Sequence, residues 1–263
     1  MLITGGTRGI GRILAEGLAG SGAFVEVVAR DKDELAETVA AIGADRCATT
    51  AADLNTEEGL AVVVEAMKAR HGELHALINN AATSRITPLD GEHRLGSWDR
   101  VLRLNVTVPF LLTAELLPLL EARSGGRVVN IGSIDGLRVP EHDAFAYASS
   151  KAALHHLTQM LAAKLGRRGV RVNAIAPCLF ETRLSAERLD GKVDQMAALN
   201  PLGRVGAAGD IVGLVQFLLS PQSDFVNGAV IPLDGGVSTR TVPFGAMSQL
   251  LTEEQFRKVV DLR

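Results

Sequence analysis

Short apolar runs alternate with longer helical patterns along most of the chain. The runs are continuous rather than alternating, which is typical of strands that are buried on both faces of a sheet. We expect seven strands, near residues 1–4, 24–29, 46–51, 75–79, 127–132, 171–176 and 228–233. Helices are predicted between them, at about 9–21, 31–43, 55–71, 97–123, 145–167 and 207–220. This alternation predicts an α/β domain whose parallel sheet is covered by helices on both faces.

A glycine-rich turn follows the first apolar run and leads into a predicted helix. It reads Thr4-Gly5-Gly6-Thr7-Arg8-Gly9-Ile10-Gly11. Strand, glycine turn and helix in this order bind a dinucleotide pyrophosphate, because glycines allow close approach and the helix N-terminus offers free N–H groups. The spacing is a variant of the commoner G-x-G-x-x-G, so a turn that only closes a strand–helix unit remains an alternative.

A second motif lies far along the chain, where Tyr147 and Lys151 are four residues apart. This spacing places both side chains on one face of the predicted helix. A free phenol titrates near about pH 10. An ammonium one turn away is expected to lower the phenol pKa, which would make Tyr147 a usable proton donor or acceptor. Taken alone, the pair also fits an ordinary surface helix.

Together these motifs resemble the short-chain dehydrogenase/reductase family, over nearly the whole chain up to about Gly236. The matching segments occur in the family's order: Thr4 to Gly11, Ala52-Asp53-Leu54, Asn79-Asn80-Ala81-Ala82, Asn105, Ser133, Tyr147 with Lys151, Pro177 to Thr182, and Asp234-Gly235-Gly236. The resemblance implies a Rossmann-type, doubly wound, seven-stranded parallel sheet of order 3-2-1-4-5-6-7. It implies one catalytic domain over 1–263, with a substrate lid at 181–203 and a C-terminal extension at 237–263. It also implies a start earlier than Met1, since few residues precede Thr4.

The family's chemistry assigns catalytic roles to four side chains. Tyr147 would donate a proton to the alkoxide that forms when a carbonyl is reduced, and Ser133 would hold the carbonyl oxygen. Lys151 would bind the nicotinamide ribose and lower the pKa of Tyr147. Asn105 would support a water that connects Lys151 to solvent. An Asn in an apolar helix also can pair with a neighbouring backbone group, and this alternative stays open.

The resemblance implies a cofactor site made by Gly5, Thr7, Arg8, Gly9, Ile10, Gly11, Arg30, Asp53, Leu54, Asn80, Ala81, Tyr147, Lys151, Pro177, Phe180 and Thr182. Ala29 stands where NAD-binding relatives carry a carboxylate, and Arg30 follows it. Because a guanidinium matches phosphate oxygens, Arg8 and Arg30 predict NADP(H) rather than NAD(H). The alternative is that both arginines are solvated and Asp31 binds the ribose.

Composition narrows the function further. The formal net charge is −3 and no basic block stands out, which argues against nucleic-acid binding. Apolar stretches end well short of the about 20 residues that a membrane span needs. Cys47 and Cys178 have neither metal-ligand nor disulfide spacing, so a cytoplasmic protein is expected.

We expect the substrate to be a small-molecule carbonyl or alcohol, and the predicted lid indicates which kind. Its apolar positions have helical spacing, which favours an alkyl or acyl chain over a sugar: Leu184, Leu189, Val193, Met196 and Leu199. The chain looks most like 3-oxoacyl (β-ketoacyl) reductases. A sugar-acid or other secondary alcohol dehydrogenase is the alternative, and a non-catalytic cofactor-binding scaffold a further one.

The family also implies a homotetramer, and Thr252-Glu253-Glu254-Gln255 predicts a short terminal helix.

Overall fold

The computed structural model describes residues 1–84, 89, 95–123, 125–140, 143–182 and 193–239. All seven predicted strands are present: β1 (Leu2–Thr4), β2 (Val25–Ala29), β3 (Cys47–Ala51), β4 (Ala76–Asn79), β5 (Arg127–Ile131), β6 (Arg171–Pro177) and β7 (Val230–Leu233). They pair in parallel in the order β3-β2-β1-β4-β5-β6-β7. The predicted Rossmann-type topology is confirmed.

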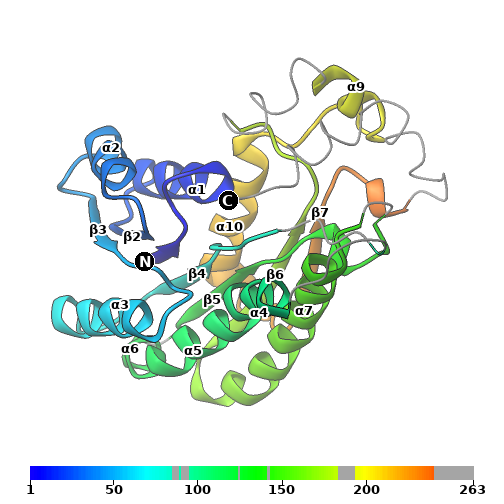
Figure 1. Cartoon of the computed structure of the whole chain (residues 1–263). Coiled ribbons are helices and arrows are strands. Elements are labelled where there is room, and N and C mark those ends of the chain that lie inside the picture. The colour runs from blue at the N-terminus through cyan, green and yellow to red at the C-terminus, as the bar shows by residue number, and fades with distance from the viewer. Residues whose placement is uncertain (85–88, 90–94, 124, 141–142, 183–192, 240–263) are drawn as a thin grey trace.

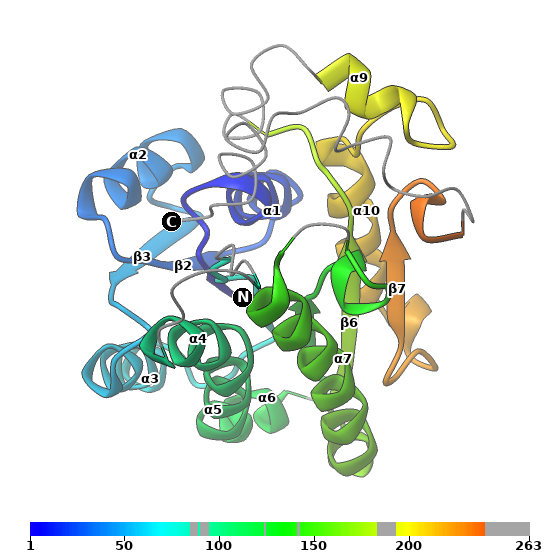
Figure 2. The same ribbon diagram turned by 45° about the vertical axis from the view of Figure 1, so that its right-hand side comes forward.

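Helices cover both faces of this sheet (Figure 1). One face carries α1 (Gly9–Gly20), α2 (Lys32–Ile42) and α10 (Ala208–Leu219). The other carries α3 (Glu57–Arg70), α4 (Leu95–Leu102), α5 (Val108–Glu115), α6 (Leu117–Ala122) and α7 (Phe145–Leu165). Short helix α9 (Val193–Ala198) lies beyond the carboxyl ends of β6 and β7, as Figure 2 shows.

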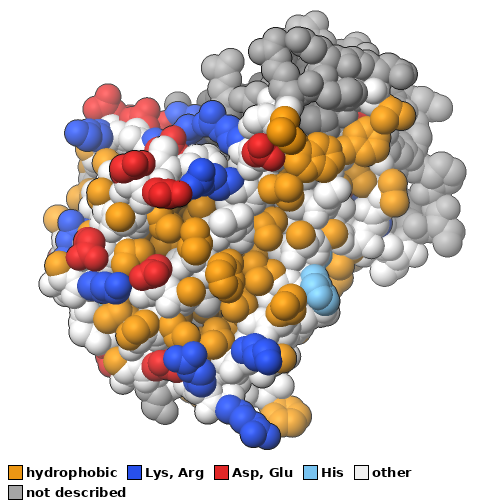
Figure 3. Space-filling view, turned by 60° about the horizontal axis from the view of Figure 1, so that its bottom comes forward, with side chains coloured by type: hydrophobic (Ala, Val, Ile, Leu, Met, Phe, Trp, Pro, Cys, Tyr) orange, Lys and Arg blue, Asp and Glu red, His pale blue; other side chains and the backbone are white. Residues whose placement is uncertain are grey.

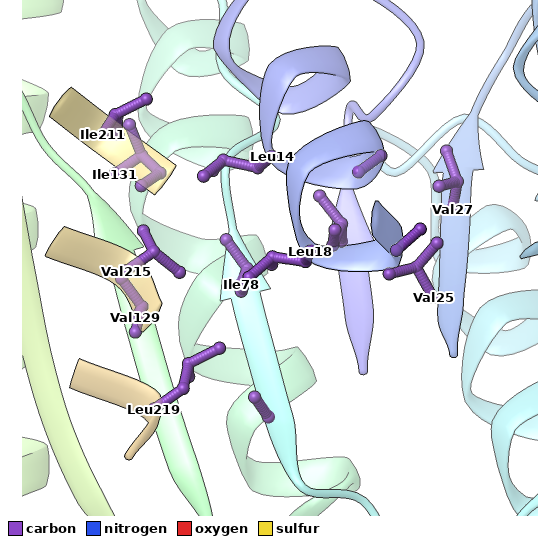
Figure 4. Close-up of a cluster of buried hydrophobic side chains, with 14 of the residues drawn as sticks. Leu14, Leu18, Val25, Val27, Ile78, Val129, Ile131, Ile211, Val215 and Leu219 are labelled. Atoms are coloured by element: carbon purple, nitrogen blue, oxygen red, sulfur yellow. The ribbon is translucent and has the colours of Figure 1, made fainter. Parts of the chain in front are cut away.

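Neighbouring strand residues point into two separate cores, as the period of two in a strand requires. Ile3 and Ile78 face one core, whereas Leu2 and Leu77 face the other, and all four are fully buried. Figure 4 shows the first core, to which α1 and α10 contribute Leu14, Leu18, Ile211, Val215 and Leu219. The continuous apolar runs in the sequence therefore reflect burial on both faces of the sheet.

Strand β1 has only three residues, yet it lies at the centre of the sheet. Its side chains are all buried, and it pairs with β2 on one side and β4 on the other. The Gly5 N–H extends the pairing by donating to the Val28 carbonyl at 2.7 Å. The glycine turn is thereby fixed at the point where the strand order reverses.

The prediction of one helix over 97–123 is wrong. A π-helical turn, Arg103–Thr107, separates α4 from α5, and Leu116 separates α5 from α6. Pro109 and Pro118 explain both interruptions, because proline lacks an N–H and its ring clashes with the carbonyl four residues earlier. For Pro109 that carbonyl belongs to Asn105, inside the π-helical turn. The predicted terminal helix after Thr252 lies outside the described residues.

Candidate active site

The carboxyl ends of β1, β4 and β5 lie side by side in the middle of the sheet. Each continues directly into predicted site residues: the glycine turn after β1, Asn80 and Ala81 after β4, and Ser133 after β5. The strand order reverses between β1 and β4, and open α/β sheets bind their ligands at such a point. The topology therefore brings segments from distant parts of the sequence to one place.

The glycine turn is held by the segment after β4. The Thr4 hydroxyl accepts hydrogen bonds from the backbone N–H groups of Asn80 (3.0 Å) and Ala81 (2.9 Å). The Asn80 amide donates to the Thr4 and Gly5 carbonyls at 2.9 and 3.0 Å. A Cβ on Gly11 would lie 2.1 Å from the Gly5 oxygen, so only glycine fits there. Asn80, predicted to bind cofactor, thus also braces the turn.

The N-terminus of α1 is suited to an anion. Arg8 occupies the N-cap position without a side-chain capping bond, and the first turn contains no acidic residue. A Cβ on Gly9, whose φ is +53°, would meet no atom of the described residues within 4 Å. Open N–H groups at a helix N-terminus, next to a glycine-rich turn, fit a pyrophosphate. Ile10 is half-buried against the adjacent core.

The end of β2 favours a phosphate over a bare ribose. Ala29 is the last residue of the strand, and Arg30 after it is exposed. The Asp31 carboxylate caps α2, accepting from the N–H groups of Asp33 (2.9 Å) and Glu34 (3.2 Å). Because Asp31 is engaged in this cap, its proposed alternative role on the ribose is disfavoured.

Two predicted cofactor residues contact a carboxylate that the sequence analysis did not single out. The Thr7 hydroxyl donates to Glu34 Oε2 at 2.9 Å, and the Arg8 guanidinium forms an ion pair with Glu34 Oε1. The Arg8 guanidinium is therefore partly neutralised by Glu34.

On the predicted adenine side, the Asp53 carboxylate accepts a hydrogen bond from the Asn55 N–H at 3.0 Å. The adjacent Leu54 is buried.

Ser133, Tyr147 and Lys151 are brought together as predicted. The Ser133 hydroxyl accepts from the Asp135 N–H at 3.1 Å and lies near enough to the Tyr147 phenol to lower its pKa. Lys151 follows Tyr147 by one turn of α7, and its Nζ lies 5.6 Å from the phenol ring centroid. That ammonium donates to the Ile131 carbonyl at 2.7 Å. The three functional groups thus converge beyond the carboxyl end of β5.

The pKa of Tyr147 differs from the sequence-based expectation. Burial raises the pKa of the phenol above its usual value, the Asp135 charge raises it further, and the Ser133 hydrogen bond lowers it. Burial also lowers the pKa of Lys151 to about 7. Since charging Lys151 is itself costly in this buried position, the expected lowering of the Tyr147 pKa is not what the structure gives. Tyr147 is a protonated acid at neutral pH.

Asn105 is buried in the π-helical turn, and its amide is fully engaged. Oδ1 accepts from the Thr83 N–H, while Nδ2 donates to the Thr83 carbonyl and the Ser150 hydroxyl, all at 2.9 Å. The alternative that this Asn pairs with a neighbouring backbone group is therefore realised. Through Ser150 the same amide is also tied to helix α7.

The segment after β6 forms the opposite wall. Pro177 ends β6, and Phe180 is buried with its ring over Gly206, where a Cβ would lie 2.7 Å from the ring. Thr182 is half-buried at the end of this segment. Burial raises the pKa of the Cys178 thiol to about 11, which fits the expected apolar wall residue rather than a nucleophile.

Only part of the predicted lid belongs to the described residues. In α9, Met196 packs with Leu179, Val193, Leu199 and Val205. Three of the five apolar lid positions therefore pack against the protein itself, whereas Leu184 and Leu189 fall outside the described residues. The packed positions do not by themselves identify a substrate.

Sequence reasoning missed Glu34, Ser150 and Asp135 as members of this site. Glu34 lies four residues after Arg30, in the first turn of α2, from which its carboxylate reaches the glycine turn. Ser150 is part of the Tyr147–Lys151 helix, and Asp135 follows Ser133 by two residues. The sequence shows where these three residues lie, but not that they interact with Arg8, Asn105 and Tyr147, which are distant in the sequence.

The described residues contain neither a candidate metal site nor a candidate membrane span. No group of three or more His, Cys, Asp and Glu side chains in these ranges is arranged to hold a metal ion. None of the described helices has the length and apolar character needed to cross a membrane.

Comparison with known proteins gives consistent matches. The family model described as enoyl-(acyl carrier protein) reductase, a short-chain dehydrogenase model, matches residues 5–238. A rhamnolipid biosynthesis 3-oxoacyl-(acyl-carrier-protein) reductase from Pseudomonas aeruginosa is 37% identical over 89% of this chain and 94% of the relative. The Pseudomonas aeruginosa RhlG/NADP active-site complex has a TM-score of 0.84 at 37% identity, covering 90% and 95% of the two chains. A gluconate 5-dehydrogenase from Burkholderia cenocepacia, solved with NADP and tartrate, has a TM-score of 0.82 at 30% identity, covering 91% and 95%.

Proposed function

The chain belongs to the short-chain dehydrogenase/reductase family, and we propose that it reduces the carbonyl group of a 3-oxoacyl substrate to a secondary alcohol. It is an NADP-dependent oxidoreductase, and its solved relatives include complexes with NADP. The observation that carries the proposal is the convergence of Ser133, Tyr147 and Lys151 beyond the carboxyl end of β5. The presence of all three groups in one place also argues against a scaffold that has lost turnover.

The cofactor would lie across the carboxyl ends of the central strands. The glycine turn and the α1 N-terminus hold the pyrophosphate, and Arg30 with Arg8 binds the 2′-phosphate. Asp53 and Leu54 line the adenine side. Lys151 and the segment with Pro177, Phe180 and Thr182 would hold the nicotinamide end. NADPH supplies the hydride when it is bound there.

The proton comes from this chain. The Ser133 hydroxyl donates a hydrogen bond to the substrate carbonyl oxygen and holds it beside Tyr147. As the oxygen gains negative charge, the Tyr147 phenol transfers its proton to it, which completes the alcohol. The raised pKa of Tyr147 keeps that proton available at neutral pH. Lys151 holds the ribose hydroxyls, and Asn105, through its hydrogen bond to Ser150, fixes the helix that carries Tyr147 and Lys151.

The substrate class rests on similarity. The 3-oxoacyl reductase of Pseudomonas aeruginosa favours an acyl substrate, and the gluconate 5-dehydrogenase structure supports a second candidate, oxidation of a sugar acid. A panel of 3-oxoacyl thioesters, enoyl thioesters, simple ketones and sugar acids, assayed with NADPH or NADP, separates them. We expect kcat/KM for the 3-oxoacyl thioester to be at least about tenfold higher than for any other substrate of the panel. This ratio corresponds to a difference of about 1.4 kcal/mol in transition-state binding. A higher value for gluconate would overturn the acyl proposal.

Assembly as a homotetramer is part of the proposal. Exposed apolar side chains lie on α4, α5 and α7, namely Leu95, Phe110, Phe145 and Met160. Figure 3 brings the lower side of Figure 1 forward and shows apolar side chains gathered in the middle of that face. Such a face fits pairing of these helices across a two-fold axis. Light scattering that gives a monomer mass would contradict it.

We also propose a cytoplasmic location. Cys47 and Cys178 are both free thiols, the first buried and the second half-buried. Unpaired cysteines fit a reducing compartment. Fractionation of the producing cells, followed by detection of the protein, tests this directly.

A further inference from the structure

Glu34 connects the start of α2 to the glycine turn. Its Oε2 accepts from the Thr7 hydroxyl at 2.9 Å, and its Oε1 forms an ion pair with the Arg8 guanidinium. The Glu34 side chain is 20% exposed, whereas that of Arg8 is 58% exposed. The carboxylate is therefore held under the guanidinium, at the place where the cofactor site meets β2.

This carboxylate is not needed to begin the helix. The Asp31 side chain already caps α2 and satisfies the Glu34 N–H at 3.2 Å. Since that cap is in place, the Glu34 side chain contributes mainly to the contact with Thr7 and Arg8. Arg30, the other cation at the end of β2, has no ion pair with the residues that the structure describes. The charge of Arg8 is thus partly neutralised by a carboxylate, whereas that of Arg30 is not.

We propose that Glu34 is a specificity-determining residue that competes with the 2′-phosphate of NADP(H) for Arg8. The proposal rests on the placement of the cofactor given above. A guanidinium bound to a carboxylate offers fewer donors and less net charge to a phosphate. The carboxylate also repels the phosphate directly, because both groups are negative at neutral pH. NAD(H) lacks the 2′-phosphate, so Glu34 acts on it only through the pyrophosphate that both cofactors share.

Glu34 therefore reduces the preference for NADP(H) that Arg8 and Arg30 would otherwise give. Removing its charge should strengthen the binding of NADPH more than the binding of NADH. The expected gain is about fivefold, the effect that a unit charge has across about 4 Å in water. The gain should decrease at high salt, since the groups are partly exposed.

The test compares Glu34→Gln with the wild-type protein by calorimetric titration of NADPH and of NADH. Glutamine keeps an oxygen that can accept from Thr7 but removes the charge. Glu37→Gln is the matched control, because it removes the same charge from an exposed position of the same helix. We expect the NADPH Kd to decrease about fivefold in Glu34→Gln and to change little in the control.

A double variant shows whether the effect passes through Arg8. In an Arg8→Ala background, Glu34→Gln should change the NADPH Kd by much less than it does in the wild type. An unchanged or weaker NADPH affinity in Glu34→Gln, or an equal gain for NADH, would overturn the proposal. Failure of the wild-type protein to bind NADPH would overturn the proposed function as well, so the two failures are distinguishable.

Discussion

The Asn105 amide donates a 2.9 Å hydrogen bond to the Ser150 hydroxyl, which in turn donates to the Tyr147 carbonyl at 2.6 Å. These contacts join the π-helical turn to the helix that carries Tyr147 and Lys151. Residues 45 positions apart are thereby fixed relative to each other in a buried environment. The interruption of the helix by Pro109 thus has a consequence for the site, because it places Asn105 against α7.

Asn105→Ala should destabilise the protein and impair turnover. It removes three buried hydrogen bonds, each worth about 1 kcal/mol, so the free energy of unfolding should decrease by about 3 kcal/mol. Denaturant titration measures this change. Thr107→Ala, at an exposed position of the same turn, is the control and should change stability by less than about 0.5 kcal/mol. A variant as stable as the wild type would show that these contacts are energetically neutral.

Gly11→Ala should abolish cofactor binding or the fold of the turn, since the added Cβ would lie 2.1 Å from the Gly5 oxygen. Gly20→Ala, in the same helix, is a matched control because its Cβ meets no atom of the described residues within 4 Å. We expect the control to keep its melting temperature and its NADPH affinity. Normal NADPH titration by Gly11→Ala would contradict the close packing of the turn.

Ala29→Asp combined with Arg30→Ala should shift the preference from NADPH to NADH. The double change removes a phosphate partner and adds a repulsive carboxylate at the end of β2. The ratio of kcat/KM for the two cofactors should decrease by at least about tenfold, or about 1.4 kcal/mol. Lys32→Ala, which removes an exposed cation two residues further on, is the control. A wild-type protein that already prefers NADH would contradict the phosphate site.

Reduction and oxidation should depend differently on pH. Burial and the Asp135 charge raise the pKa of Tyr147, so the phenol stays protonated through neutral and mildly alkaline pH. Reduction needs the protonated phenol, and its rate should stay level as the pH rises across that range. Oxidation needs the phenolate, and its rate should increase with pH over the same range. Rate profiles in both directions check this. Because burial lowers the pKa of Lys151 to about 7, a change near that pH in both directions reports on Lys151, whereas an oxidation rate that does not increase at higher pH would contradict the role of the phenol.

The sequence predicts the fold well because burial on both faces leaves continuous apolar runs. It also predicts the neighbourhood of Tyr147 and Lys151, since helical periodicity fixes their spacing. The interruption at Asn105 was predictable only by giving Pro109 more weight than the surrounding apolar pattern. The upward shift of the Tyr147 pKa was not predictable, because it depends on burial and on Asp135. The contact of Glu34 with Arg8 joins a helix to a loop, and no local pattern encodes such a pairing.

The central claim is that this protein transfers a hydride from NADPH to a carbonyl carbon while Tyr147 supplies the proton. The most direct measurement uses NADPH that carries deuterium at both C4 positions of the nicotinamide, with a 3-oxoacyl thioester as substrate. Mass spectrometry of the product should find one deuterium on the carbinol carbon. Tyr147→Phe should still bind NADPH but form that product about 10²-fold more slowly. An alcohol without deuterium, or unchanged turnover in Tyr147→Phe, would contradict the account.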